Sequence, residues 1–452
     1  MKLYPIIGMS IATAITFSSC SRISTSPTHA FHHVQQDVVE RSGQEISWDN
    51  DYSFNDWLED TLQEELTIDQ VVKIALLNNQ LLKATYEDLG IAQAHLVQAG
   101  LLQNPIFSLS LRYENLVESA SIIEMGLVQN LLDLLLKPLK KRLAYTELEI
   151  VKEEVTARVL DVIAETTIAF YTLQAANQLL DLQMQQFEAG ELSYDAAKRL
   201  YAAGNINSLS LTIERANYEK KKIDLAESEV AVVDARERLN VLMGLWGCRL
   251  NWEIGKDAEN IPPLVNEVAD IERMAITNSI DLKMARKRIK ATAISMGIEI
   301  SEQVFPEMYI GPDSEKEPEG GWFIGPQFSL SIPIFDTGMA KKAEGCARLS
   351  KQWKEYCALV IDIRSAARSA MFRMTNALFR YRHFHDVVIP LEEEVTQETL
   401  HQLNAMQIGV FQLLETKQNE IDTKIRSILS FKDYWTARTE IETLLNGRMI
   451  HN

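Results

Sequence analysis

The residue with the clearest chemical prospect is Cys20, which follows a charged start and an apolar run. Lys2 precedes the mostly apolar segment Ile6 to Phe17, and the small residues Ser18 and Ser19 then lead to the cysteine. This order is typical of a secretory signal that ends at a cysteine, as in a bacterial lipobox. Acyl chains on such a cysteine anchor a protein to a membrane through the burial of many CH₂ groups. We therefore predict a covalent lipid on Cys20 and no other cofactor.

Two neighbours of Cys20 refine this prediction. Phe17 stands where a lipobox usually has Leu, so an ordinary signal peptide with an incidental cysteine is the alternative. Ser21 is not Asp, which by resemblance to lipoproteins favours sorting to the outer membrane.

The remaining residues that could bind metals or catalyse reactions form no convincing site. Three cysteines, Cys248, Cys346 and Cys357, have no CxxC spacing, and we interpret them as buried thiols. His29, His32 and His33 lie in a polar segment where histidines are more often solvated than metal-bound. The histidines of RHFHD, residues 382–386, face different directions on a helix. The chain has no GxSxG, HExxH, P-loop or GxGxxG motif, so we expect no metal site, no catalytic residue and no enzyme activity.

Composition excludes a nucleic-acid partner. The chain has 452 residues, 46% of them apolar, which is ample for a large core or two repeated halves. Its formal charge of −18 leaves no extended basic face for phosphates. This acidity suits a path for cations or simple solubility.

The elements that must position these residues occur twice. LTIDQVVKIALLNNQLL, Leu66 to Leu82, parallels VADIERMAITNSIDL, Val268 to Leu282, and RLYAAGNINSLSL parallels QLNAMQIGVFQLL, always about 200 residues further on. Each half has the order helix, strand, strand, long helix, turn, helix. The first helix is predicted to begin after Thr67 as its N-cap, with Gln70 at the spacing of a capping box. The predicted divisions are a signal peptide at 1–19, a lipidated tether at 20–65, repeat 1 at 66–247, an equatorial linker at 248–267, repeat 2 at 268–447 and a tail at 448–452.

Four segments alternate apolar and small polar residues, the pattern of a strand with one apolar face. Such strands of about nine to eleven residues match a tilted membrane-crossing strand. The loop at Pro312 to Gly321 is expected to be exposed. The predicted strands are Pro105 to Tyr113, Ile122 to Asn130, Glu307 to Gly311 and Trp322 to Phe335. The predicted lipid-facing residues are Phe107, Leu109, Leu111, Phe328, Leu330 and Ile332.

Four strands cannot close around a pore, and an unpaired backbone group in hydrocarbon costs several kcal/mol. Two chains would give eight strands filled by their own side chains, whereas three would give twelve with room for a pore. A trimer is therefore the smallest assembly that suits transport. From Asp133 to Gly204 and from Asp336 to Met406 the chain also forms two helical limbs of about 70 residues, each about 105 Å long.

The chain resembles the TolC-like outer-membrane efflux proteins over Leu66 to Gly447. The resemblance rests on LTIDQVVKIALLNNQLL, on GPQFSLSIPIFDTG and on the two turn motifs. It implies a mainly α fold with a small β part. In it, a homotrimer forms a 12-stranded barrel in the outer membrane, continuous with a 12-helix periplasmic tunnel. With Cys20, the chain is most similar to the acylated branch that serves RND-type pumps.

The resemblance also implies roles for residues at the two hairpin turns, Gly204 and Met406. Relatives usually have Gly at both, so we expect the turn at Met406 to be shaped differently. Gln412 and Glu415 match positions that ring the aperture in relatives, and three copies of Glu415 would attract cations at a narrow axis. The alternative is that Glu415 is an ordinary solvated helix charge.

The predicted function is a passive exit duct in the outer membrane. An inner-membrane RND-type pump supplies the energy, and a periplasmic adaptor docks at the turns. Two alternatives remain open, which are the exit duct of a type I protein secretion system and an acylated coiled-coil scaffold without a pore. The cargo is not indicated, because the 14 methionines form no spaced ladder and Met readily fills helical seams.

Overall fold

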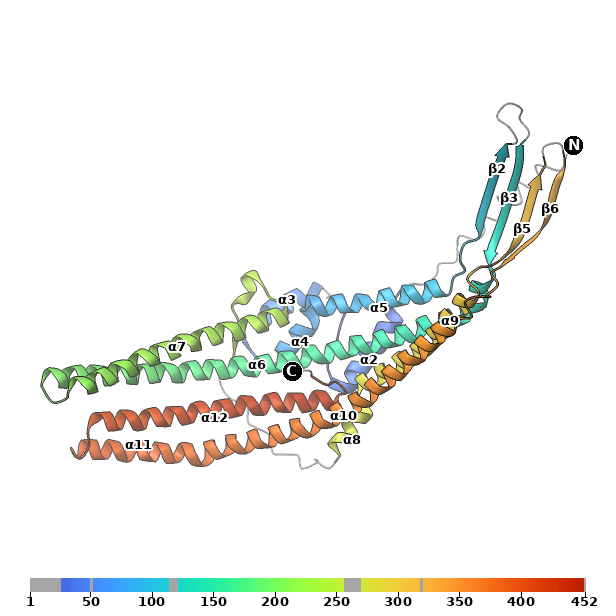
Figure 1. Ribbon diagram of the computed structural model, residues 1–452. Coiled ribbons are helices and arrows are strands. Elements are labelled where there is room, and N and C mark those ends of the chain that lie inside the picture. Colours follow the sequence, from blue (N-terminus) through green and yellow to red (C-terminus); the bar gives the residue numbers. More distant parts are fainter. Residues whose placement is uncertain (1–25, 49–51, 114–120, 256–269, 318–319, 451–452) are drawn as a thin grey trace. The chain divides into compact units, whose positions relative to one another are not determined.

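The computed structural model describes residues 26–48, 52–113, 121–255, 270–317 and 320–450 (Figure 1). The predicted lipidation site Cys20 lies outside these residues. The chain divides into two compact units, unit 1 with residues 1–33, 87–152 and 287–353, and unit 2 with the rest. The fold is mainly helical with a small sheet, as the sequence predicts. Among the described helices, none is long and apolar enough to cross a membrane.

Unit 1 contains an antiparallel sheet of four strands in the order β2-β3-β5-β6. Its strands are β2 (Ile106–Tyr113), β3 (Ser121–Asn130), β5 (Met308–Lys316) and β6 (Trp322–Leu330). Each strand pairs with the next along the chain, and the β3 to β5 pairing joins the two sequence repeats.

Two strand boundaries differ from the prediction by more than one residue. β5 continues through Pro312 to Lys316, which we expected to be a loop, because this segment pairs with β6 along its whole length. β6 ends at Leu330, so Ile332 lies outside the strand and the predicted extension to Phe335 is wrong. The partner strand β5 begins at Met308, opposite Leu330, so the ladder gives Ile332 no strand residue to pair with.

The helical part of unit 1 consists of segments of four long helices. These are α5 (Gln80–Ala99), α6 (Leu131–Ala202), α9 (Ile280–Val304) and α10 (Met339–His383). Leu132 and Leu136 of α6 pack with Ile298 of α9 in a small core. Lys140 lies between Asp133 and Glu302, 2.9 Å from each carboxylate, and so links α6 to α9.

Unit 2 contains the helical hairpins and the joints at their ends. Its additional helices are α2 (Thr28–Ser42, which begins in unit 1), α3 (Tyr52–Thr61), α4 (Ile68–Asn78), α7 (Ser208–Met243), α8 (Ile271–Asn278), α11 (Ile389–Asn404) and α12 (Val410–Leu445). Two short strands that sequence reasoning missed, β1 (Glu65–Leu66) and β4 (Glu253–Ile254), pair in parallel. A 3-10 turn, Gly247–Leu250, precedes β4.

The same order of elements occurs in both halves of the chain. The first half runs α4, α5, β2, β3, α6, α7, and the second runs α8, α9, β5, β6, α10, α11, α12. The first long limb is one helix of 72 residues. The second is interrupted by a π-helical turn, Phe384–Val388, directly before Pro390 at the start of α11. Proline lacks the N–H that a regular α-helix needs, which accounts for the local change in hydrogen bonding.

The start of α4 confirms a prediction from local sequence. Thr67 is the N-cap, and its hydroxyl accepts a hydrogen bond from the backbone N–H of Gln70. The side chain of Gln70 accepts one in return from the backbone N–H of Thr67 at 2.8 Å. This capping box satisfies two N–H groups that would otherwise lack partners.

The segment predicted to be a tether is largely helical. Val38 of α2 and Leu58 of α3 are fully buried, and Arg41 donates hydrogen bonds to the carbonyl oxygens of Asn446 (2.7 Å) and Asn278 (3.1 Å). Tertiary packing therefore orders a stretch whose local sequence shows little periodicity. The three free cysteines are also exposed, which corrects their interpretation as buried thiols.

The core of unit 2 is aromatic and joins both halves of the chain. Tyr171 of α6 stacks on Trp435 of α12 with ring centroids 4.3 Å apart. Phe431 packs edge-on against the same two rings. Trp252, which follows the 3-10 turn, is almost fully buried and donates a hydrogen bond to Asn240 at 2.9 Å. These large side chains position the hairpins relative to each other within this unit.

Candidate functional site: the strand sheet and the two hairpin turns

One face of the sheet in unit 1 is mainly apolar, with Gln129, Ser314 and Lys316 as its polar exceptions. Phe107 pairs with Leu127, and Ile310 pairs with Phe328. Residues paired across antiparallel strands lie on the same face, and the face alternates along each strand. The register therefore places five of the predicted lipid-facing residues, Phe107, Leu109, Leu111, Phe328 and Leu330, on one face. That face also carries residues which sequence reasoning missed: Ile123, Met125, Leu127, Met308, Ile310, Trp322 and Ile324.

The opposite face is mainly polar. Arg112 of β2 forms an ion pair with Glu124 of β3 at 2.9 Å, and both side chains lie on this face. Its apolar exceptions are Ile106, Ile122, Val128, Tyr309 and Phe323. The polar side chains on this face are Ser108, Ser110, Arg112, Glu124, Asp313, Glu315, Gln327 and Ser329.

The sheet has two edge strands, β2 and β6, which pair on one side only within the described chain. Their outer N–H and C=O groups are thus available to further strands. A sheet with an apolar face can persist in hydrocarbon only when such edges are paired. The sheet of one copy is therefore chemically incomplete as a membrane element.

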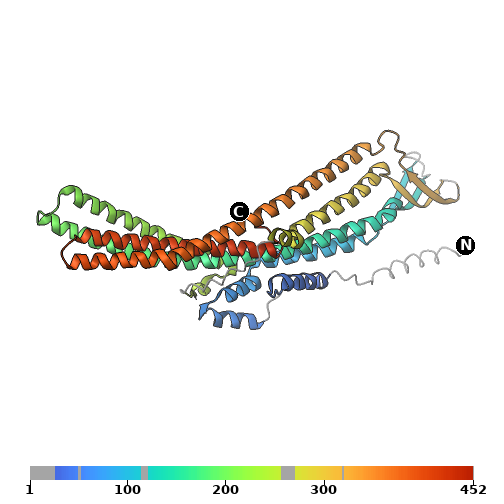
Figure 2. The same ribbon diagram turned by 90° about the horizontal axis from the view of Figure 1, so that it is seen from below.

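The hairpins α6–α7 and α11–α12 end in turns at the same end of unit 2 (Figures 1 and 2). In the first turn Gly204 has φ 77°, and the N–H of Asn205 bonds the carbonyl of Leu200 at 2.8 Å. In the second, Met406 has φ 59°, and the N–H of Gln407 bonds the carbonyl of Gln402 at 3.0 Å. Both are helix ends of the Schellman type with a left-handed residue. The expectation that Met406 reshapes its turn is therefore wrong, since Met adopts the conformation of the usual glycine.

The two turns differ in how their side chains support them. Asn207 caps α7 by accepting a hydrogen bond from the N–H of Ser210 at 2.9 Å. Gly409 begins α12 without a side-chain cap. A left-handed backbone costs an L-residue other than Gly about 1–2 kcal/mol. The second turn thus combines a strained Met406 with an uncapped helix start and is the weaker one.

Gln412 and Glu415 occupy the first two turns of α12, directly after the second hairpin turn. Both side chains are exposed. Within the described residues Glu415 forms no ion pair, so its carboxylate is open to solvent. The aperture ring predicted for these two residues requires other copies of the chain and stays a prediction.

Sequence reasoning missed a buried polar contact between the hairpins. Gln186 of α6 is almost fully buried, donates a hydrogen bond to Asp422 of α12 and accepts one from Lys221 of α7. The sequence signal for this contact was a polar residue at a seam position of the helix, where apolar residues are usual. This contact links three helices on the side of the aromatic core that faces the turns.

Two equivalent joints hold the other ends of the hairpins. The side-chain N–H₂ of Asn78 donates to the carbonyls of Met243 and Gly244, each at 2.9 Å, and that of Asn278 donates to Leu445 at 2.9 Å. The helix breaks after these asparagines, with extended ψ at Asn79 and Ser279. The sequence repeat relates Asn78 to Asn278, 200 residues further on. The structure shows why, because each side chain bonds carbonyl oxygens at the C-terminal end of a hairpin helix.

Gly244 and the corresponding Gly447 follow the C-terminal ends of α7 and α12 and have left-handed conformations, with φ 65° and 100°. A Cβ at Gly244 would lie 2.7 Å from the carbonyl oxygen of Asn78, and one at Gly447 would overlap that of Asn278. Close approach of backbone to backbone therefore requires glycine at both joints.

The histidines of α2, His29, His32 and His33, are exposed. Among the described residues, no three His, Cys, Asp or Glu side chains gather closely enough to hold a metal ion.

Long helical hairpins on the same chain as a sheet with one apolar and one polar face are features expected of TolC-like outer-membrane channels. The motifs in the sequence predicted this class, and the comparison with solved structures confirms its fold. The CmeC outer membrane channel of Campylobacter jejuni has a TM-score of 0.70 and 14% identity, with 90% of each chain covered. The transmembrane channel protein CusC has a TM-score of 0.66 and 14% identity, covering 86% of this chain and 94% of its own.

Among curated proteins, the cobalt-zinc-cadmium resistance protein CzcC of Cupriavidus metallidurans is 20% identical over 389 residues, 84% of this chain and 90% of that protein. No family model matches the chain. The similar proteins are channels and a resistance protein, none of them described as an enzyme, in agreement with the prediction of no enzyme activity.

Proposed function

We propose that the chain is the outer-membrane exit duct of a tripartite efflux system. It passively conducts substrates that an inner-membrane RND-type pump expels through a periplasmic adaptor. The observation that carries this proposal is the sheet in unit 1, which has one apolar face, one polar face and two open edges. A sheet of this kind fits a barrel wall between lipid and water.

The open edges favour a homotrimer. Three copies contribute twelve strands, enough for a barrel with an aqueous pore, whereas two contribute eight and leave only room for side chains. The same three copies bring twelve hairpin helices together as a periplasmic α-barrel. The acyl chains proposed on Cys20 add a lipid anchor in the outer membrane.

The turns at Gly204 and Met406 are the proposed docking points for the adaptor. Both are exposed, at the same end of unit 2 (Figure 2), and Met406 presents almost its whole side chain to solvent. A flexible, polarisable Met suits a surface that must engage a partner. An adaptor that binds the open arrangement more tightly than the closed one would open the hairpins by shifting their equilibrium.

The resistance protein CzcC makes metal cations the first cargo to test. That relative is named for resistance to cobalt, zinc and cadmium. A strain that lacks this chain is expected to become sensitive to such ions, and a challenge with drugs and bile salts shows the breadth of the cargo. Unchanged tolerance of all these compounds would weaken the efflux assignment and favour the secretion alternative.

The decisive experiment compares two faces of one strand. Leu109→Arg places a charge on the apolar face of β2, and Ser110→Arg places the same charge on the polar face. Arginine on the lipid face costs about 2–4 kcal/mol at the bilayer midplane, whereas a pore-facing Arg only alters selectivity. We expect Leu109→Arg to abolish assembly in the outer membrane and Ser110→Arg to retain it.

Conductance of the purified mature chain in planar bilayers completes this test. The proposal predicts stable channels from the unaltered chain and from Ser110→Arg. A water-soluble monomer that passes no ions would contradict the duct and leave the acylated scaffold as the better explanation.

A further inference from the structure

Helix α7 exposes a face that combines apolar and acidic side chains. Its positions follow alternating steps of four and three residues, the spacing of a seam between helices. We call these residues the acidic face: Ile223, Glu227, Val230, Asp234, Glu237 and Val241. The apolar members are strongly exposed, with Ile223 at 59%, Val230 at 60% and Val241 at 68%. A seam pattern in solvent indicates a helix surface that lacks its partner in one copy.

Helix α10 exposes a matching face that combines apolar and basic side chains. Within unit 2 its apolar members are again strongly exposed, with Ile361 at 65%, Phe372 at 73% and Phe379 at 66%. We call these residues the basic face: Ile361, Arg364, Arg368, Phe372, Thr375, Phe379 and Arg382. In a chain with a formal charge of −18, three arginines along one helix face stand out against the average surface.

Some charged side chains on each face are available to form ion pairs with a partner. Within the described residues, Glu227 and Asp234 form no ion pair, nor do Arg364 and Arg382. Arg368 has one, with Glu272 of α8 at 3.0 Å. The two faces therefore carry opposite charges available to a partner.

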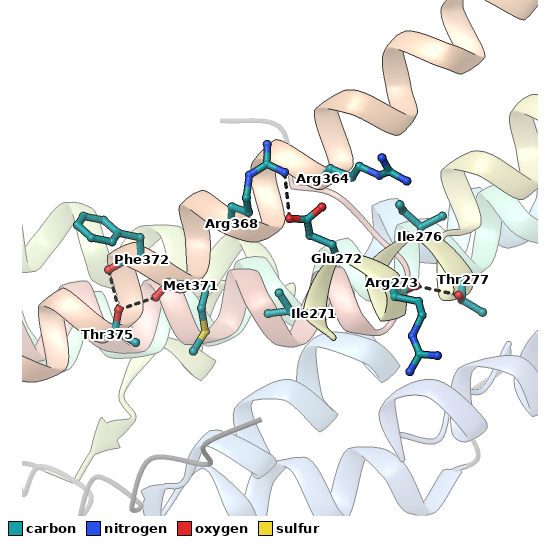
Figure 3. A pocket seen from close by; sticks show the side chains of 10 residues that line it. All are labelled: Ile271, Glu272, Arg273, Ile276, Thr277, Arg364, Arg368, Met371, Phe372 and Thr375. Carbon is teal, nitrogen blue, oxygen red and sulfur yellow. Dashed lines mark hydrogen bonds and ion pairs between the residues drawn. The ribbon is translucent and has the colours of Figure 1, made fainter. Parts of the chain in front are cut away.

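A pocket lies on the basic face, between α8 and α10. It has a volume of about 780 Å³ and is lined by Ile271, Ile276 and Met371 together with Arg364 and Arg368 (Figure 3). Figure 3 shows the two arginines and Phe372 on α10, with Ile271 and Ile276 on the facing α8. Apolar side chains flanked by carboxylates are the chemistry that fits such a pocket.

We propose that the acidic face of one copy packs on the basic face of the next copy, as an antiparallel helix seam. In a single register, Val241 meets Ile361, Val230 meets Phe372 and Ile223 meets Phe379. The same register brings Asp234 opposite Arg368 and Glu227 opposite Thr375, and it places Glu237 within one residue of Arg364. Every apolar residue then meets an apolar one and no acid meets an acid, whereas Arg382 lies opposite Lys220, beyond the end of the acidic face. Complementary charges of this kind set register and partner choice.

The antiparallel direction follows from the fold of unit 2. Val241 lies near the joint at which α7 ends, and Ile363 of α10 packs with Leu444 beside the equivalent joint. From this joint, the chain of α10 runs toward the turn at Met406. The chain of α7 runs the opposite way, from the turn at Gly204 to its own joint. Copies related by a rotation axis parallel to the hairpins keep their joints level, so Val241 and Ile361 meet at one end of the seam and Ile223 and Phe379 at the other.

The seam also sets the type of assembly. It joins two different surfaces, and such a heterologous contact generates a ring when the rotation closes, whereas a two-fold dimer would use one surface twice. This inference rests on the proposed duct, since it supplies the contact between the copies in the trimer.

Cross-linking tests the register. Cys248, Cys346 and Cys357 are replaced by Ser, and a short bis-maleimide is applied to the assembled mature chain. Val241→Cys with Ile361→Cys, and Ile223→Cys with Phe379→Cys, are expected to give covalently linked dimers and trimers. The control, Ile223→Cys with Ile361→Cys, exposes thiols on the same faces about 27 Å apart along the helices. It is expected to give none.

Charge reversal tests the complementarity. Arg364→Glu with Arg368→Glu is expected to weaken association about tenfold per interface, because two attractive contacts become repulsive. Adding Asp234→Arg and Glu237→Arg to the same chain is expected to restore it. Conducting trimers that show no cross-link at the predicted pairs, or no effect of reversal, would overturn the seam and leave the duct standing. A monomer without conductance would overturn both.

Discussion

Met406 holds a left-handed backbone that glycine adopts without strain. Its side chain is 93% exposed, so its removal loses almost no packing. Met406→Gly is therefore expected to raise the free energy of unfolding by about 1 kcal/mol, measured by urea denaturation of the full chain in detergent. The reciprocal change Gly204→Met, at the equivalent turn with φ 77°, is expected to lower it by a similar amount. Destabilisation by Met406→Gly would show that the Met side chain has contacts in the assembly.

The joint asparagines provide a second test with single substitutions. Asn78→Ala removes two hydrogen bonds to the carbonyls at the end of α7, and we expect a loss of about 1–2 kcal/mol in the same measurement. Asn78→Asp is expected to cost more, because a carboxylate cannot donate these bonds and faces the negative end of the helix dipole. Asn278→Ala removes the single bond to Leu445 and is expected to cost less than Asn78→Ala. Equal tolerance of Ala and Asp at residue 78 would contradict the capping role.

The structural features that follow from the sequence alone are local ones. The capping box of Thr67 and Gln70 depends on spacing within one helical turn, and alternation along β2 fixes the face of Phe107. Ile332 lies outside β6 because the partner strand begins at Met308, opposite Leu330, a limit that alternation alone does not reveal. The backbone of Met406 was missed because its left-handed conformation follows from the turn and overrides the preference of the residue.

Helix α12 contains a buried carboxylate, Glu420, whose contribution to the free energy of unfolding is expected to depend on pH. The side chain of Glu420 is 3% exposed and accepts hydrogen bonds from Lys417 and Lys424, each at 2.8 Å. Burial alone would raise the pKa of Glu420, but the two lysines outweigh it and hold the pKa below its ordinary value. A carboxylate whose pKa falls on folding stabilises the protein above its unfolded pKa and loses that effect as the pH falls through the folded pKa.

Glu420→Gln is therefore expected to lower the free energy of unfolding at pH 7 by about 1–2 kcal/mol. The difference from the unaltered chain is expected to shrink below the ordinary carboxyl pKa of about 4.3. Denaturation at a series of pH values measures this, with the exposed Glu253→Gln as a control that removes the same charge from β4. A difference that grows on acidification would contradict the assigned direction of the pKa shift.

Among the elements, the long helices and the order of elements along each half followed from periodicity and from the repeat, whereas the exceptions depend on tertiary contacts. Helices α2 and α3 have weak patterns of their own and are ordered by burial of Val38 and Leu58. The two-residue strands β1 and β4 are too short to have a period and exist only because they pair with each other. Pro390 indicates an irregularity in the helix, but the sequence does not indicate that it takes the form of a π-helical turn.

The assembled molecule unites the two proposals. Open strand edges in unit 1 and complementary helix faces in unit 2 are independent features, yet each requires a neighbouring copy. The open strand edges alone are compatible with any number of copies that closes the sheet into a barrel. The heterologous helix seam excludes a two-fold dimer, which leaves the ring that twelve strands also favour.

In such a ring, Glu415 would place three carboxylates around the axis near the hairpin turns. Glu415→Gln is then expected to lower the cation-to-anion permeability ratio severalfold, and Gln412→Glu to raise it, because fixed charge at a constriction controls which ions enter. Reversal potentials under a salt gradient in planar bilayers measure the ratio. The effect is expected to fade in strong salt, since the screening length falls from about 10 Å at 0.1 M to about 3 Å at 1 M. Glu253→Gln removes the same charge far along the chain from the turns, so an equal effect of that control would show that only the overall acidity, and no ring at Glu415, selects cations.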